Sequence, residues 1–191
     1  MKFNSFYSKA ITFTLILSIS GCASIPSHVI VAPDIMVTPA VFHNNKQAQL
    51  DVIDMRTANH VIQIMRKGEA STLISARERL ETTINNKLNK HWKKQGLTLN
   101  YSGINTINVA IEKAIISVIQ ETMEYKVQTE IMLKVTVNNG SQTLKSTFKN
   151  RGNSDGPLQA DIAVLERNFN QRLAKLLQQI LANKKISDFL R

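Results

Sequence analysis

The chain has 191 residues and a formal net charge of +10, with 43% hydrophobic and 20% charged residues. A chain of this length can bury one sizeable core, and this composition excludes an intrinsically disordered protein. The single cysteine excludes an intramolecular disulfide as a source of stability.

The first segment has the pattern of an export signal peptide. Residues 1–9 contain two lysines and no acidic residue, and residues 10–17 are mostly apolar. A membrane-spanning helix needs about 20 apolar residues, so this stretch is too short for a permanent transmembrane anchor. We predict a signal peptide over residues 1–21.

The residues that follow predict a lipid anchor. Ile19, Ser20 and Gly21 precede Cys22, which is the order of a lipobox, in which small residues before the thiol admit the lipoprotein signal peptidase. We expect Cys22 to carry S-diacylglycerol and an N-acyl chain such as palmitate. The alternatives are a cut elsewhere or a buried free thiol, and the position, the flanks and the absence of another cysteine favour lipidation.

The predicted anchor fixes a location. Each buried acyl methylene contributes about 0.8 kcal/mol, so two or three chains hold a protein firmly. In enteric-type bacteria an aspartate after the lipidated cysteine retains a lipoprotein at the inner membrane, and here that position is Ala23. We therefore expect the outer membrane, on its periplasmic face, with residues 22–27 as a tether and residues 28–191 as a single domain.

The first part of that domain reads as short strands. Residues 28–31 and 35–37 are apolar runs interrupted by proline, which is confined to edge strands or bulges. After a polar loop over residues 43–49, strands are predicted over 50–55 and 60–65, joined by a short connector.

A helix is expected next, beginning at the capping box of Ser75 to Glu78. Gly96 suits the position just after its end. Trp92 is either an interface anchor or, as we prefer, a core residue. The apolar side chains recur at four-residue spacing and predict an amphipathic helix, and they are Ala76, Leu80, Ile84, Leu88 and Trp92.

A long strand is predicted over residues 106–119, where Ile and Val dominate. Its alternation slips near Lys113 and Ala114, as a β-bulge would cause. A second strand over residues 125–137 alternates along its whole length, which predicts one buried and one exposed face.

Asn139 and Gly140 then predict a type I′ hairpin turn, because both central residues of that turn need positive φ. Residues 143–149 pair back as the last strand. Residues 150–157 are rich in Gly, Asn, Asp and Pro and are predicted to form a loop.

A second long amphipathic helix completes the domain, followed by a short terminal turn over residues 186–190. Its apolar stripe comprises Leu158, Ile162, Leu165, Phe169, Leu173, Leu176 and Ile180. The predicted fold class is α+β, an antiparallel β-sheet with two long amphipathic helices packed on one face.

This order of elements resembles the YajG-like family of bacterial lipoproteins over nearly the full chain. The likeness rests on the lipobox, a polar-capped helix, long paired strands with an Asn-Gly turn and a terminal helix. Its short sequence signatures are Ala32-Pro33, Asp54-Met55-Arg56, Gln95-Gly96 and Ile186-Ser187-Asp188-Phe189. The resemblance implies a lipoprotein and a fold class, and it carries over no active-site residue.

No pattern for catalysis, cofactor binding or metal binding is evident. The four histidines, His28, His43, His60 and His91, are scattered without zinc-ligand spacing, and no nucleophile elbow or phosphate-binding glycine loop occurs. A serine with a distant histidine is compatible with the sequence, so a hydrolase stays as the third alternative. We expect no enzyme.

Two polar groups call for a choice between structural and functional roles. Asp54 and Arg56 form a functional pair or, as we prefer, a local ion pair that closes a corner. The second is a basic group on the two predicted helices and the residues after them. It either binds an anionic envelope polymer or, as we prefer, is solvated surface. Its members are Lys87, Lys90, His91, Lys93, Lys94, Lys184 and Lys185.

The functional expectation is a noncatalytic binding or assembly-support module that contacts the membrane through its lipid and another envelope protein through its domain. The alternative partner is peptidoglycan or lipopolysaccharide, bound by the basic helices. Nucleic acid is not expected, because the anchor places the domain outside the cytoplasm.

Overall fold

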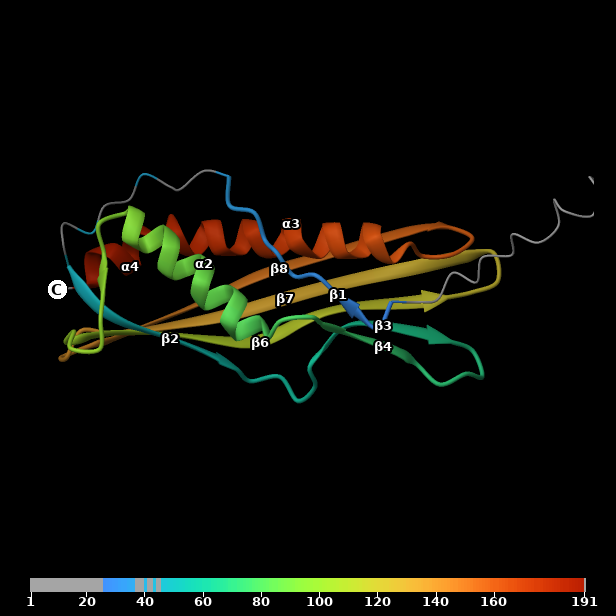
Figure 1. Cartoon of the computed structure of the whole chain (residues 1–191), viewed down its shortest axis with the longest axis horizontal. Helices are drawn as coiled ribbons and strands as arrows, with labels where there is room; N and C mark the ends of the chain where they lie inside the picture. Colours follow the sequence, from blue (N-terminus) through green and yellow to red (C-terminus); the bar gives the residue numbers. More distant parts are fainter. Residues whose placement is uncertain (1–25, 37–39, 41–42, 44–45, 191) are drawn as a thin grey trace, which may run out of the picture.

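The computed structural model describes residues 26–36, 40, 43 and 46–190 (Figure 1). The predicted signal peptide, its lipobox and Cys22 lie outside the described residues. The same holds for most of the predicted tether and for parts of the segments predicted over 35–37 and 43–49.

Within the described residues, eight strands form one sheet that is covered by helices (Figure 1). The strands are β1 (His28–Val29), β2 (Gln47–Asp54), β3 (His60–Arg66), β4 (Thr72–Ala76), β5 (Thr98–Leu99), β6 (Asn105–Gln120), β7 (Glu124–Asn138) and β8 (Thr143–Pro157). The helices are α2 (Leu80–Lys94), α3 (Ile162–Leu181) and α4 (Lys184–Phe189).

The sheet is organised around β6, its longest strand. On one side β7 pairs with β6 antiparallel along its whole length, and β8 continues the sheet antiparallel to β7. On the other side β6 has two parallel partners placed end to end, β2 along its first half and β3 along its second. β4 pairs antiparallel with β3, β1 parallel with β4, and β5 parallel with β2.

The predicted antiparallel sheet with two long helices on one face is wrong. The described residues are mostly β, a curled half-barrel of mixed strands with about 26% of these residues in helices. Periodicity reports which residues are buried but not strand direction, and the crossover through α2 makes β6 parallel to both β2 and β3. Over this sheet α2 packs against β2, and α3 packs against β8 and β7.

The core lies between the sheet and the helices. The alternating residues of β6 and β7 are buried as predicted, among them Ile107, Val109 and Leu133. The predicted β-bulge is confirmed, because the register of β6 against β7 shifts between Ile111 and Lys113. The pairing of β2 with β6 ends at Ile111, beside this bulge, and the pairing of β3 with β6 begins at Ile116.

The predicted start of the first helix is wrong. Ser75 and Ala76 end strand β4, and α2 begins at Leu80 with Arg79 at its N-cap and no side-chain cap. Glu78 instead accepts a hydrogen bond from the Thr83 hydroxyl. The rest of the apolar stripe is buried as predicted, including Trp92, which packs in the core.

The loop predicted over residues 150–157 is instead the second half of β8, which pairs with β7 as far as Pro157. Among the described strands β8 pairs only with β7, so proline and small polar residues are tolerated there. Its glycines make room for neighbours, because a Cβ at Gly152 would overlap the Arg172 guanidinium and one at Gly156 would overlap the Tyr125 ring.

The hairpin between β7 and β8 is confirmed, but its predicted turn type is wrong. The strands close at the pair of Asn138 and Thr143, which leaves a four-residue loop. Only Gly140 has positive φ there, at 85°, whereas a type I′ turn requires it at two successive residues.

Candidate functional site

The sheet has two ends that differ in character. At one end β3 and β6 end, β7 begins and β8 ends. We call it the cleft end, after the cleft that opens there. The distal end is the opposite one, where β6 and β8 begin and β7 ends. Both lie at the extremities of the long axis in Figure 1.

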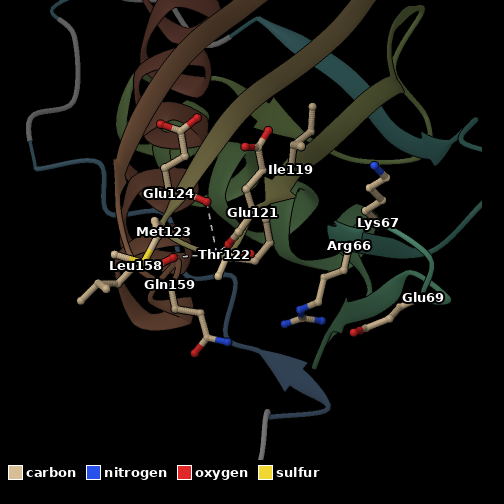
Figure 2. A pocket seen from close by; sticks show the side chains of 11 residues that line it. Arg66, Lys67, Glu69, Ile119, Glu121, Thr122, Met123, Glu124, Leu158 and Gln159 are labelled. Atoms are coloured by element: carbon tan, nitrogen blue, oxygen red, sulfur yellow. Dashed lines mark hydrogen bonds between the residues drawn. The ribbon is translucent and has the colours of Figure 1, made fainter.

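A cleft of about 1080 Å³ opens at the cleft end (Figure 2). One wall comes from the end of β3 and the turn after it, with Arg66, Lys67 and Glu69. The opposite wall comes from the β6–β7 turn and the connection between β8 and α3, with Met123 and Leu158 among its residues. The cleft is therefore built by turns on a rigid sheet, where binding residues are commonly placed.

Gln120 holds the second wall together. Its side-chain nitrogen lies 2.8 Å from the carbonyl oxygen of Glu121, 3.3 Å from that of Glu124 and 2.6 Å from that of Leu158. Its side-chain oxygen accepts from the backbone N–H of Ala160 at 3.1 Å. One amide thereby fastens the β6–β7 turn to the segment that leads into α3.

Leu158 occupies a backbone conformation that leucine rarely adopts. Its φ is 64°, and among the described residues no other residue except glycine has a positive φ. This conformation costs a non-glycine residue about 1–2 kcal/mol. It is held by the Leu158 N–H, which donates to the Met123 carbonyl at 2.8 Å, and by Gln120.

The result is a group of exposed apolar side chains at the rim of the cleft. Leu158 is 63% exposed, Met123 70% and Ile119 50%. Backbone strain at an exposed apolar residue is typical of a functional surface. The charges beside it have both signs, and the hydrogen bond with Glu124 raises the pKa of Lys126.

The chain enters the domain on a segment that is fastened to α3. The backbone N–H of Ile30 donates to the Glu166 carboxylate at 2.9 Å. Asn170 bonds the same segment twice, accepting from the N–H of Ala32 and donating to the carbonyl of Ile30, both at 2.9 Å. The first described residues are thus attached to the helix layer as well as to β4.

The distal end presents different groups. Tyr101 is 91% exposed and Ile104 77%, both in the loop between β5 and β6. Asn139 braces the neighbouring turn, accepting from the N–H groups of Ser141 and Gln142 and donating to the carbonyl of Phe189 in α4. Sequence patterns did not identify these exposed residues, and a loop containing Gly103 was their only signal.

The predicted basic group lies toward the distal end, but not all of it is surface charge. His91 is buried, and burial and then Lys94, Lys90 and Lys87 lower its pKa. Within the described part of the chain, the lysines of this group form no ion pair within 4 Å.

The predicted pair of Asp54 and Arg56 closes the corner between β2 and β3, as we preferred. Their side chains form an ion pair at 2.7 Å, and both are nearly buried. Arg56 also donates to the carbonyl oxygens of His60 and Ala114, each at 3.1 Å. The guanidinium thus joins the two strands to the bulge of β6, which is a structural role.

The histidines are less scattered than the sequence indicated, because His28 and His60 both pair with Ser75 across neighbouring strands. The described residues contain no group of three or more His, Cys, Asp or Glu that could hold a metal ion. None of the described helices combines the length and the apolarity needed to cross a bilayer.

Comparison with solved structures identifies related folds. The DUF330 protein of Xanthomonas campestris matches with a TM-score of 0.55 and 10% identity, over 86% of this chain and 97% of that chain. At such identity the likeness shows the fold alone. Rare lipoprotein B of Shewanella oneidensis matches with a TM-score of 0.28 and 9% identity, over 66% and 87%, which is too low to carry an argument.

No curated protein matches the chain. Residues 33–191 match the model of a family described as uncharacterized lipoproteins, and this range includes every described helix and strand after β1. The chain therefore belongs to this lipoprotein family.

Proposed function

We propose that the chain is a YajG-like lipoprotein, anchored to the outer membrane by acylated Cys22, that acts in the periplasm as a noncatalytic binding or assembly-support module for another envelope protein. The observation that carries the binding role is the pair of exposed residues Tyr101 and Ile104 at the distal end. Tyrosine is enriched at the centres of protein interfaces.

The length of the sheet supports this arrangement. β6 has 16 residues, and a strand rises about 3.3 Å per residue, so the two ends lie about 50 Å apart. A partner that binds the distal end is separated from the cleft end by the whole sheet. The β7–β8 turn lies close to this pair, since a Cβ added at Gly140 would be 2.9 Å from the Ile104 side chain.

Site-specific photocrosslinking in cells tests the proposal. A photoreactive residue at position 101 or 104 is expected to give a discrete protein adduct. The same residue in place of Asn153, which is exposed on β8, is the control and is expected to give none. Absence of a discrete adduct at both distal positions would contradict the binding role.

The second candidate is binding of peptidoglycan or lipopolysaccharide, favoured by the exposed lysines of α2 and α4 that lack ion pairs among the described residues. Sedimentation of the protein with purified sacculi at low and high salt discriminates the two. Charge-driven binding weakens as salt screens it, and replacement of Lys93 and Lys94 by glutamine reduces it. Contacts made by Tyr101 and Ile104 are much less sensitive to salt.

A further inference from the structure

The direction of β1 shows where the anchored end of the chain leaves the domain. β1 runs parallel to β4, and β4 runs antiparallel to β3. β3 points toward the cleft end, so β1 points away from it. The chain therefore enters β1 from the side of the cleft end.

The tether is short relative to the distance it must cover. His28 is six residues after Cys22, and an extended chain spans at most about 3.3–3.6 Å per residue, or about 20 Å over this tether. His28 and His60 pair with the same residue of β4, and β3 extends from His60 to Arg66, about 20 Å farther toward the cleft end. A fully extended tether thus reaches about as far as the end of β3.

The bilayer must then lie close to the cleft end whenever Cys22 is acylated. This step rests on the lipid anchor of the proposed function. It places the exposed side chains of Ile119, Met123 and Leu158 near the headgroups, and an apolar surface next to a polar rim is suited to the boundary between headgroups and acyl chains.

We infer that the cleft end docks on the lipid surface that holds the anchor, with Ile119, Met123 and Leu158 inserted at the headgroup boundary. Leu158 is kept outward by its hydrogen bonds in spite of its positive φ. The strained backbone therefore presents this apolar side chain to the bilayer.

The charges at this end specify the kind of docking. The cleft carries Arg66, Lys67 and Glu69 on one wall and Glu121 and Glu124 on the other, so charges of the two signs largely offset one another (Figure 2). Docking consequently depends on apolar insertion, and neither salt nor the proportion of anionic lipid changes it greatly. The exposed lysines toward the distal end stay in the aqueous phase.

Fluorescence of the full acylated chain, reconstituted in phosphatidylethanolamine and phosphatidylglycerol vesicles, tests the inference. Single variants M123C and L158C carry an environment-sensitive fluorophore, and Y101C and I104C are the matched distal controls. We expect the labels at 123 and 158 to shift to the blue and to be quenched by spin-labelled lipid. The distal labels are expected to be quenched by aqueous iodide.

Adding Leu158→Ser to the M123C variant is expected to reduce the docked population relative to the undocked one about fivefold, because most of one leucine side chain no longer enters the apolar phase. High salt is expected to leave the lipid quenching unchanged. Loss of the quenching in salt would contradict apolar docking.

The wild-type chain separates failure of docking from failure of the anchor. Its only cysteine is Cys22, so an acylated chain takes up no thiol label. Labelling of the wild-type chain would overturn the lipid anchor, and the docking with it. An unlabelled chain whose variants at 123 and 158 are as accessible to iodide as the distal ones would overturn the docking alone.

Discussion

At each end of the sheet a single side-chain amide joins a hairpin turn to the helix layer, either to a helix or to the segment that leads into one. At the cleft end Gln120 joins the β6–β7 turn to the residues before α3. At the distal end Asn139 joins the β7–β8 turn to α4. The partners in both cases are backbone N–H and carbonyl groups.

The two amides differ in burial and in what their hydrogen bonds hold in place. Asn139 is buried, and its bonds close the distal turn over the core. Gln120 is only partly buried, and its bonds hold Leu158 in a strained conformation with the side chain in solvent. The same chemistry therefore stabilises the fold at one end and presents an apolar surface at the other.

The largest loss of stability is expected from replacement of Asn139 at the distal end. Asn139→Ala removes an acceptor for two backbone N–H groups and the donor to Phe189 in a buried position, so it is expected to cost about 2–3 kcal/mol of unfolding free energy. Urea unfolding measures it. The neighbouring control, Asn138→Ala, loses one exposed bond to Gly140, and an equal loss there would refute the distinction.

Gln120 at the cleft end is expected to contribute less to the unfolding free energy than Asn139. Gln120→Ala should lower the unfolding free energy by about 1–2 kcal/mol, because water can replace some of the lost bonds at this partly buried site. Hydrogen exchange should accelerate at the N–H groups of Leu158 and Ala160. Gln128→Ala, exposed on β7, is the control and is expected to stay within about 0.5 kcal/mol of the wild type.

Leu158→Gly is expected to change the unfolding free energy and the docking on lipid vesicles in opposite directions. Glycine adopts positive φ without the cost of about 1–2 kcal/mol, but it loses about 0.5–1 kcal/mol more through chain entropy, so a net gain of about 0.5 kcal/mol is expected. The same variant should dock less well on lipid vesicles. A stability loss, or undiminished docking, would show that the backbone is not strained for display.

The smallest expected effect is the pH dependence of the unfolding free energy that arises from two buried histidines, His43 and His91. Burial lowers the pKa of His43, with Lys46 adding repulsion, and burial lowers that of His91, with Lys94, Lys90 and Lys87 adding repulsion and Asp34 opposing them. Below their ordinary value of 6.5 the unfolded chain binds protons that the folded one excludes. The unfolding free energy should therefore fall as pH falls below 6.5.

Urea midpoints across this range measure the effect. The double variant with both histidines replaced by glutamine should have a smaller pH dependence between neutral and mildly acidic conditions. If the wild type were as stable in mild acid as at neutral pH, these two groups would not be held neutral by the fold.

Sequence reasoning predicted much of the local structure, because burial leaves a periodic signal. The alternation of β6 and β7, the bulge at Lys113 and the buried stripe of α2 are seen in the structure. Strand direction was mispredicted because parallel and antiparallel pairing can bury the same alternating residues. Residues 150–157 were misassigned because their glycines serve Arg172 and Tyr125, which are distant in sequence.

The candidate surfaces were harder to predict than the core. Leu158 was assigned to a helix stripe, whereas it precedes α3 and points into solvent. Its role depends on Gln120 and Met123, which lie in another turn, and no sequence pattern connects them. Ionic closure of the β2–β3 corner was predictable, because Asp54 and Arg56 are only two residues apart.

Mass spectrometry of the amino-terminal peptide, released from protein extracted from membranes, tests whether Cys22 is the lipid-modified first residue. The expected first residue is Cys22, carrying diacylglycerol and an amide-linked acyl chain. A mature chain that begins elsewhere, or an unmodified Cys22, would contradict the anchor and the orientation derived from it.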